Sequence, residues 1–111
     1  MNAAPEIEET RSPKGKPAFR EQIEHLAASR EIDLEELHRR FIEGGYGGVD
    51  RYDRNISLQR FEQHASGETG ALNQAFLWGL EGVLGLTEEE VMDFLWLYLW
   101  GVPRPAQLRQ A

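Results

Sequence analysis

Apolar residues recur at helical spacing in five stretches of the chain, and no stretch alternates with period two for long enough to indicate a strand. The first stretch begins at Pro17, a residue suited to the first turn of a helix, and runs to about Arg30. Its apolar face consists of Phe19, Ile23, Leu26 and Ala27. Together the five stretches predict an all-α domain over residues 17–101, followed by a short tail over residues 102–111.

The second predicted helix has Asp33 as its N-cap, with Glu36 at the capping-box position, and it ends at Gly44-Gly45. Its inward positions are Leu34, Leu37, Phe41 and Ile42, and its outward positions include Glu35, Arg39 and Arg40. The glycine-rich residues 44–49 lack the lysine and hydroxyl residue of a phosphate-binding P-loop. We therefore expect a flexible connector there, with Tyr46 as its one anchor.

A short third helix is predicted within residues 51–67, opened by small polar residues and closed by Gly67. Its buried stripe is Leu58, Phe61 and Ala65, and its opposite stripe is Arg54, Asn55, Gln59, Arg60 and Gln63. Arginine binds guanine and phosphate, and asparagine and glutamine pair with adenine, so this face suits nucleic acid. A merely solvated polar face is the alternative, and the helix taken alone favours it.

The fourth helix is expected to open at Thr69 or Gly70 and to end at Gly85. It carries an apolar face made by Leu72, Phe76, Leu80, Val83 and Leu84. Gly79 and Gly82 lower its intrinsic helix propensity, which usually indicates close approach to a neighbouring helix.

The fifth helix opens with a capping box over residues 87–90 and then runs to Trp100 with Asp93 as its only further polar residue. A helix that is apolar on nearly every side is either central or shared with a partner. We assign Val91, Phe94, Leu95 and Tyr98 to the core of the domain, and Met92, Trp96 and Trp100 to a homodimer seam. The alternative is that the tail folds back over Trp96 and Trp100.

Composition narrows the class of protein. At 111 residues and 41% hydrophobic, the chain allows one domain, and with no cysteine it cannot form a disulfide or a cysteine-ligated zinc site. The three histidines share no ligand spacing, and no catalytic grouping is evident, so we expect no metal, no cofactor and no enzyme activity. Neither a secretory signal nor a membrane span is evident, so we expect a cytoplasmic protein.

The net charge of −7 is unevenly distributed. Residues 37–64 hold five arginines against four acids, whereas residues 65–101 hold six acids and no lysine or arginine. An acidic body with a locally basic helix predicts weak, salt-sensitive DNA binding. Residues 1–16 are predicted to form a disordered arm, and the alternative is a basic arm that reaches along DNA through Arg11, Lys14 and Lys16.

Residues 19–90 resemble the lambda-repressor-like helix-turn-helix family, also called the Cro or XRE type. The resemblance is carried by Phe19-Arg-Glu-Gln-Ile-Glu-His-Leu26, by Ile32-Asp-Leu-Glu-Glu-Leu-His38, by Ser57-Leu-Gln-Arg-Phe-Glu62 and by the run from Leu80 to Glu90. The chain departs from the family at His38, where alanine is usual, and in residues 42–53, which replace a tight turn. We expect this insertion either to lengthen the second helix or to displace the third.

The resemblance implies a five-helix DNA-binding domain that acts as a homodimer on an inverted-repeat operator. It implies that bases are read by Arg54, Asn55 and Gln59, and that Ser57, Arg60, Arg39 and Arg40 lie near the phosphates. The alternative is a protein-interaction module that keeps the scaffold but binds another protein through the surface of Trp96 and Trp100.

Overall fold

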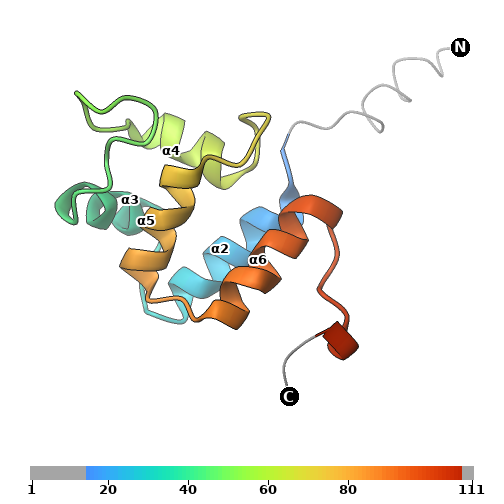
Figure 1. Ribbon diagram of the computed structural model, residues 1–111. Helices are drawn as coiled ribbons and strands as arrows, with labels where there is room; N and C mark the ends of the chain where they lie inside the picture. Colours follow the sequence, from blue (N-terminus) through green and yellow to red (C-terminus); the bar gives the residue numbers. More distant parts are fainter. Residues whose placement is uncertain (1–14, 109–111) are drawn as a thin grey trace, which may run out of the picture.

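The computed structural model describes residues 15–108, which form five α-helices and one short 3-10 helix without a strand (Figure 1). The elements are α2 (Pro17–Ala28), α3 (Leu34–Glu43), α4 (Leu58–Ala65), α5 (Gln74–Leu84), α6 (Glu88–Trp100) and η1 (Ala106–Leu108). The prediction of an all-α chain with five helices is confirmed for these residues. The basic-arm positions Arg11 and Lys14 lie outside the described residues.

Side-chain caps set the starts of four helices. Asp33, Ser57, Asn73 and Thr87 each accept a hydrogen bond from a backbone N–H of the first turn. Thr87 and Glu90 form the complete capping box that the sequence predicts for α6. The box predicted at Asp33 is only half formed, because the Glu36 carboxylate accepts hydrogen bonds from Arg39 and Arg40 instead.

The start of α5 differs from the prediction. The helix begins at Gln74 rather than at Thr69 or Gly70, because the Asn73 side chain accepts the N–H of Phe76 at 3.1 Å. Leu72, which suggested the longer helix, is partly buried but lies in the segment that precedes the cap. A residue can therefore share the apolar pattern of a helix without belonging to it.

Two aromatic clusters hold the helices together. In the first, Phe19 of α2 stacks on Phe94 of α6 at 4.5 Å between ring centroids and meets the edge of Tyr98 at 4.9 Å. In the second, Phe61 of α4 lies 4.8 Å from Phe41 of α3 and 5.3 Å from Phe76 of α5. The buried positions agree with the predicted faces except for six that are only partly buried, namely Ile42, Leu58, Leu72, Val83, Val91 and Leu95.

The second cluster requires that α5 carry no side chain at two of its positions, Gly79 and Gly82. A Cβ on Gly79 would lie 2.6 Å from Cζ of Phe41, and a Cβ on Gly82 would lie 2.6 Å from Cζ of Tyr46. The predicted close approach at both glycines is confirmed. At Gly82, however, the neighbour is a tyrosine of the loop after α3 rather than a helix.

Packed structure continues past the predicted limits of 17–101. Gly101 ends α6 in the left-handed conformation, and the chain then runs back beside that helix (Figure 1). Arg104 is 7% exposed and donates hydrogen bonds to Glu89 and, at 2.9 Å, to Asp93. We call residues 101–108 the C-terminal strap. At the other end, the Lys16 N–H donates to the Ser66 carbonyl at 2.6 Å.

Candidate functional site

The residues predicted to read DNA are divided between a helix and a loop. Gln59 and Arg60 lie exposed in the first turn of α4, but Arg54 and Asn55 do not lie on it, so the prediction of a helical location for these two is wrong. The cause is Ser57, whose hydroxyl accepts the Arg60 N–H at 3.1 Å and thereby fixes the start of the helix. Arg54 and Asn55 belong to the exposed segment that leads into the cap.

That segment is the end of the α3–α4 loop, residues 44–57, which is held by hydrogen bonds along its length. The Ile56 N–H donates to the Gly47 carbonyl at 2.8 Å, and His38 Nε2 donates to the Ile56 carbonyl at 2.7 Å. The Asn73 amide donates to the Val49 carbonyl at 3.3 Å. Tyr46 is an anchor as predicted, but it is one of several, so the loop is not the flexible connector that the sequence suggested. The insertion has not lengthened the second helix either, since α3 ends at Glu43.

Asp50 joins the loop to α4. Its carboxylate accepts hydrogen bonds from the buried His64 Nε2 and from Arg60 Nε, each at 2.8 Å. Partial burial by itself raises the pKa of the Asp50 carboxyl, but the hydrogen bonds and charges of Arg60 and His64 outweigh it, so the net pKa lies below its ordinary value. The sequence analysis missed this contact, because nothing in the spacing of Asp50 and His64 marks them as neighbours.

Three arginines come together where the loop meets α4. Arg51, Arg54 and Arg60 line a hollow of about 230 Å³, with the polar side chains of Asn55 and Ser57 beside them. Two carboxylates reduce this positive charge, since Asp50 pairs with Arg60 and the neighbouring Asp53 pairs with Arg51 at 3.4 Å. The structure therefore brings together four of the predicted DNA-binding residues and adds Arg51, which the prediction left out.

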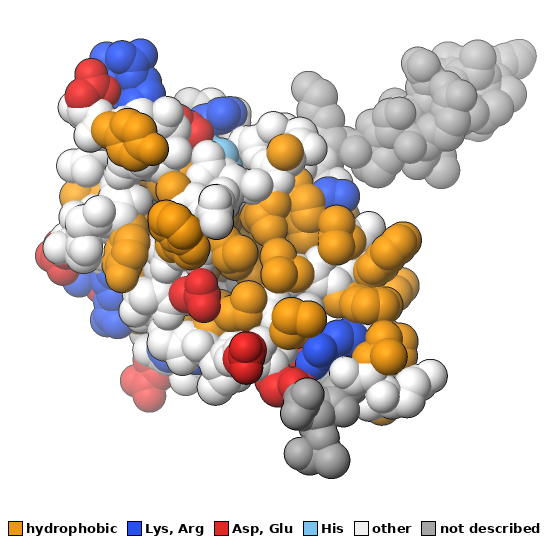
Figure 2. All heavy atoms as spheres, viewed as in Figure 1, with side chains coloured by type: hydrophobic (Ala, Val, Ile, Leu, Met, Phe, Trp, Pro, Cys, Tyr) orange, Lys and Arg blue, Asp and Glu red, His pale blue; other side chains and the backbone are white. Residues whose placement is uncertain are grey.

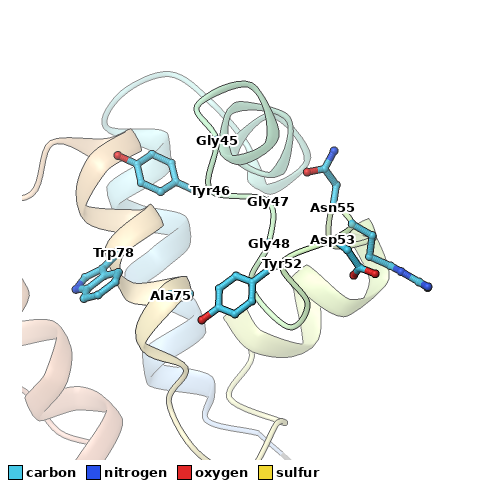
Figure 3. A pocket seen from close by; sticks show the side chains of 10 residues that line it. Gly45, Tyr46, Gly47, Gly48, Tyr52, Asp53, Asn55, Ala75 and Trp78 are labelled. Atoms are coloured by element: carbon cyan, nitrogen blue, oxygen red, sulfur yellow. The ribbon is translucent and has the colours of Figure 1, made fainter.

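A second hollow adjoins the first, because Arg54 and Asn55 line both. It has a volume of about 510 Å³, and the aromatic side chains in its lining are Tyr46, Tyr52 and Trp78. Figure 3 shows Tyr52 on the side of the loop that faces α5, whereas Asp53 and Asn55 lie farther from that helix. Aromatic and polar side chains of the α3–α4 loop therefore line adjoining hollows.

The two arginines predicted on α3 are already paired with acids. Arg39 bonds both Glu36 and Glu43, and Arg40 bonds Glu36 at 2.9 Å. Hydrogen bonds from Arg39 and Arg40 lower the pKa of Glu36 to about 2, so this carboxylate is ionised at neutral pH. Both arginines point outward as predicted, but each must exchange a carboxylate for a phosphate before it can hold DNA.

The side chains of the predicted dimer seam are largely exposed to solvent. Met92 is 46% exposed and Trp100 is 63% exposed, while Trp96 is partly buried and its Nε1 is enclosed without a hydrogen-bond partner in residues 15–108. The strap does fold back, as the alternative supposed, but it leaves Trp100 in solvent. Figure 2 shows apolar side chains gathered over this part of the molecule. The exposed ones form what we call the α6 surface, which consists of Met92, Leu99, Trp100, Val102 and Leu108.

Residues 15–108 contain neither a metal-binding cluster nor a membrane-spanning helix. No three histidine, aspartate or glutamate side chains lie close enough together in that range to hold a metal ion. Of the helices that the structure describes, none has the length and apolar character to cross a membrane.

Comparison with known proteins adds no relative to this picture: no protein-family model, no curated protein and no solved structure matches the chain.

Proposed function

We propose that the chain is a small sequence-specific DNA-binding regulator that acts as a homodimer on an inverted-repeat operator. The observation that carries the proposal is the hollow at the start of α4, where Arg51, Arg54 and Arg60 converge beside Asn55 and Ser57. Gln59 is exposed in the same turn of the helix. Guanidinium and amide side chains on one face can bind phosphates and base edges together, which is the combination that sequence reading requires.

The bases are read by Gln59 of α4 together with Arg54 and Asn55 of the loop. A helix that reads bases must be held in a fixed position on the domain, and the packing of Phe61 against Phe41 and Phe76 holds α4 in this way. The lambda-repressor-like arrangement of the two motif helices, with the α3–α4 loop in place of the tight turn, belongs to the same proposal. In it, Asp50 fixes the loop against α4, so that both elements meet the groove in one orientation.

The charges on this face predict modest affinity. Arg39, Arg40, Arg51 and Arg60 all have carboxylate partners, and only Arg54 among the proposed DNA-contacting arginines has none within residues 15–108. If each protomer neutralises two or three phosphates, the logarithm of the binding constant should fall with the logarithm of salt with a slope of about −2 to −3 per protomer. Binding should therefore be strongest at low ionic strength.

Alanine substitutions test the assignment. Arg54→Ala and Gln59→Ala should each cost about 1–3 kcal/mol for the preferred duplex, measured by fluorescence anisotropy. Gln107→Ala, which removes an exposed glutamine from η1, is the matched control and should bind as the wild type does. Equal binding by Arg54→Ala, Gln59→Ala and the control would remove the basis of the proposal.

A protein-interaction module is the second candidate, and the α6 surface favours it. Exposed apolar side chains gathered in one region usually mark a site where another protein binds. In the DNA-binding proposal this surface joins two copies of the chain, whereas in the second candidate it binds a different protein. Trp100→Asp separates the two, because it should dissociate a homodimer in the first case and a heteromeric complex in the second.

A further inference from the structure

The α3–α4 loop is longer than its span requires. Helices α3 and α4 pack directly against each other through Phe41 and Phe61, yet residues 44–57 lie between them. Packed neighbouring helices are commonly joined by about 2–8 residues, and longer ordered loops usually have a functional role. The extra length is therefore a feature that the packing of the helices does not explain.

The loop is also held in one shape. Gly47, Val49, Asp50, Ile56 and Ser57 accept or donate the hydrogen bonds described above, and the Tyr46 N–H donates a further one to the Phe41 carbonyl at 2.8 Å. The Tyr46 ring lies against Gly82, where any side chain would displace it. A binding loop that is ordered before its ligand arrives loses less conformational entropy on binding.

This fixed loop presents Tyr52 to solvent. The side chain of Tyr52 is 102% exposed, so it contributes nothing to the core. Arg51 precedes it and Arg54 follows two positions later, and both are exposed. An aromatic ring next to guanidinium groups is suited to a nucleic-acid backbone, whose sugars offer apolar surface between the phosphates.

The three-arginine hollow lies beside this tip. Its lining carries three guanidinium groups against the single carboxylate of Asp50, and Asp53 lies next to it, so a positive charge remains after both acids are counted. Arg51–Asp53 is an exposed pair, and such pairs contribute little, so a phosphate can displace Asp53 at small cost. Arginines that converge on one point are suited to a phosphate group, because each guanidinium group can donate two parallel hydrogen bonds to the phosphate oxygens.

We propose that Arg51 and Tyr52 of the α3–α4 loop make a second nucleic-acid contact, on the DNA backbone, beside the base contacts of Arg54, Asn55 and Gln59. The guanidinium groups of Arg51 and Arg60, which line the hollow, hold a backbone phosphate, and Tyr52 packs against the sugar of the adjoining nucleotide. This inference rests on the proposed function, and it assigns a role to Arg51 and Tyr52, which base reading by α4 does not involve.

The test measures binding of a fluorescein-labelled random-sequence duplex of about 30 base pairs over a range of salt concentrations. Arg51→Ala should weaken binding and reduce the salt slope by about 1. Tyr52→Ala should weaken binding about tenfold without changing the slope, because it removes the apolar packing of the ring and no charge. Tyr52→Phe keeps the ring and should stay within about twofold of the wild type.

The outcomes separate this inference from the function on which it rests. If the wild type binds DNA and Gln59→Ala weakens binding to its preferred duplex, but Arg51→Ala and Tyr52→Ala bind like the wild type, the second contact is refuted alone. If the folded wild type binds no duplex even at low salt, the proposed function fails and the second contact fails with it. Circular dichroism of each variant checks folding, which the exposure of both side chains predicts to be unaffected.

Discussion

Replacing Gly79 with alanine should destabilise the protein, although alanine is the better helix former. A Cβ on Gly79 would lie 2.6 Å from Cζ and 2.9 Å from Cδ2 of Phe41, and closer still to Cε2. The Phe41 ring cannot move aside, because it is fully buried against Phe61 at 4.8 Å and Phe76 at 5.6 Å. Either the ring cluster or the α5 backbone must therefore shift.

The magnitude follows from two opposing effects. Overpacking of a filled core costs about 1–3 kcal/mol, and contacts this short place Gly79→Ala at about 3 kcal/mol. The higher helix propensity of alanine compared with glycine stabilises the folded protein by about 1 kcal/mol. The net loss is about 2 kcal/mol, which in a domain of this size lowers Tm by about 8–16 °C.

Thermal and urea unfolding followed by circular dichroism measure this loss. The matched control is Gly82→Ala on the same helix, where the added Cβ meets the hydroxyl end of Tyr46. Tyr46 is only partly buried and can tilt, so the control should lose less stability. The double variant Gly79→Ala/Phe41→Leu should lose less than the sum of its single changes, because the two residues are in contact. A Tm for Gly79→Ala equal to or above that of the wild type would refute the packing of α5 on Phe41.

Three further predictions concern the two surfaces and the strap. Trp100→Asp should change the free energy of unfolding by no more than about 0.5–1 kcal/mol, since the side chain is exposed, but should shift sedimentation from dimer to monomer; a monomeric wild type would contradict the seam. Arg104→Ala leaves Glu89 and Asp93 without their arginine and should cost about 1.5–3 kcal/mol and expose the strap to proteolysis; unchanged protection would contradict its anchoring role. Because the pKa of Asp50 is lowered in the folded protein, its stabilising effect is present above the ordinary value of 3.8 and is lost as pH falls below it. The difference in unfolding free energy between the wild type and Asp50→Asn should therefore shrink at acid pH, and a constant difference would exclude this linkage.

The sequence correctly predicted the features that depend on contacts between residues close together in the chain. The caps at Asp33 and Thr87 and the helix ends at Gly85 and Gly101 follow from contacts within a few residues, and all four are confirmed. The two glycines of α5 also signalled close packing correctly. Such features are readable because backbone geometry and capping chemistry are local.

The features that the sequence did not predict depend on contacts between distant residues. Asp50 reaches His64 across a loop and a helix, and Arg104 reaches back to Asp93 and Glu89, so none of these pairs is marked by helical spacing. The start of α4 was predicted wrongly for a different reason. Several polar residues before the helix could each serve as a cap, and only the hydrogen bond of Ser57 shows which one does.

The ordered conformation of the α3–α4 loop likewise could not be predicted from the sequence. Its glycines indicated flexibility, but its hydrogen bonds come from His38, Asn73 and His64, which lie in other parts of the chain. Exposure of Tyr52 could not be inferred from the sequence either, because tyrosine is intermediate between the residue types that are mostly buried and those that are mostly exposed.

Selection of bound duplexes from a random DNA pool at low salt, followed by sequencing, tests the central claim most directly. A homodimer that reads bases through Arg54, Asn55 and Gln59 predicts enrichment of an inverted repeat whose half-sites are about one helical turn apart. The Gln59→Ala protein, selected in parallel, should enrich a sequence with relaxed preference at one position of each half-site. Absence of any enriched sequence, from protein shown to be folded, would contradict the DNA-binding account.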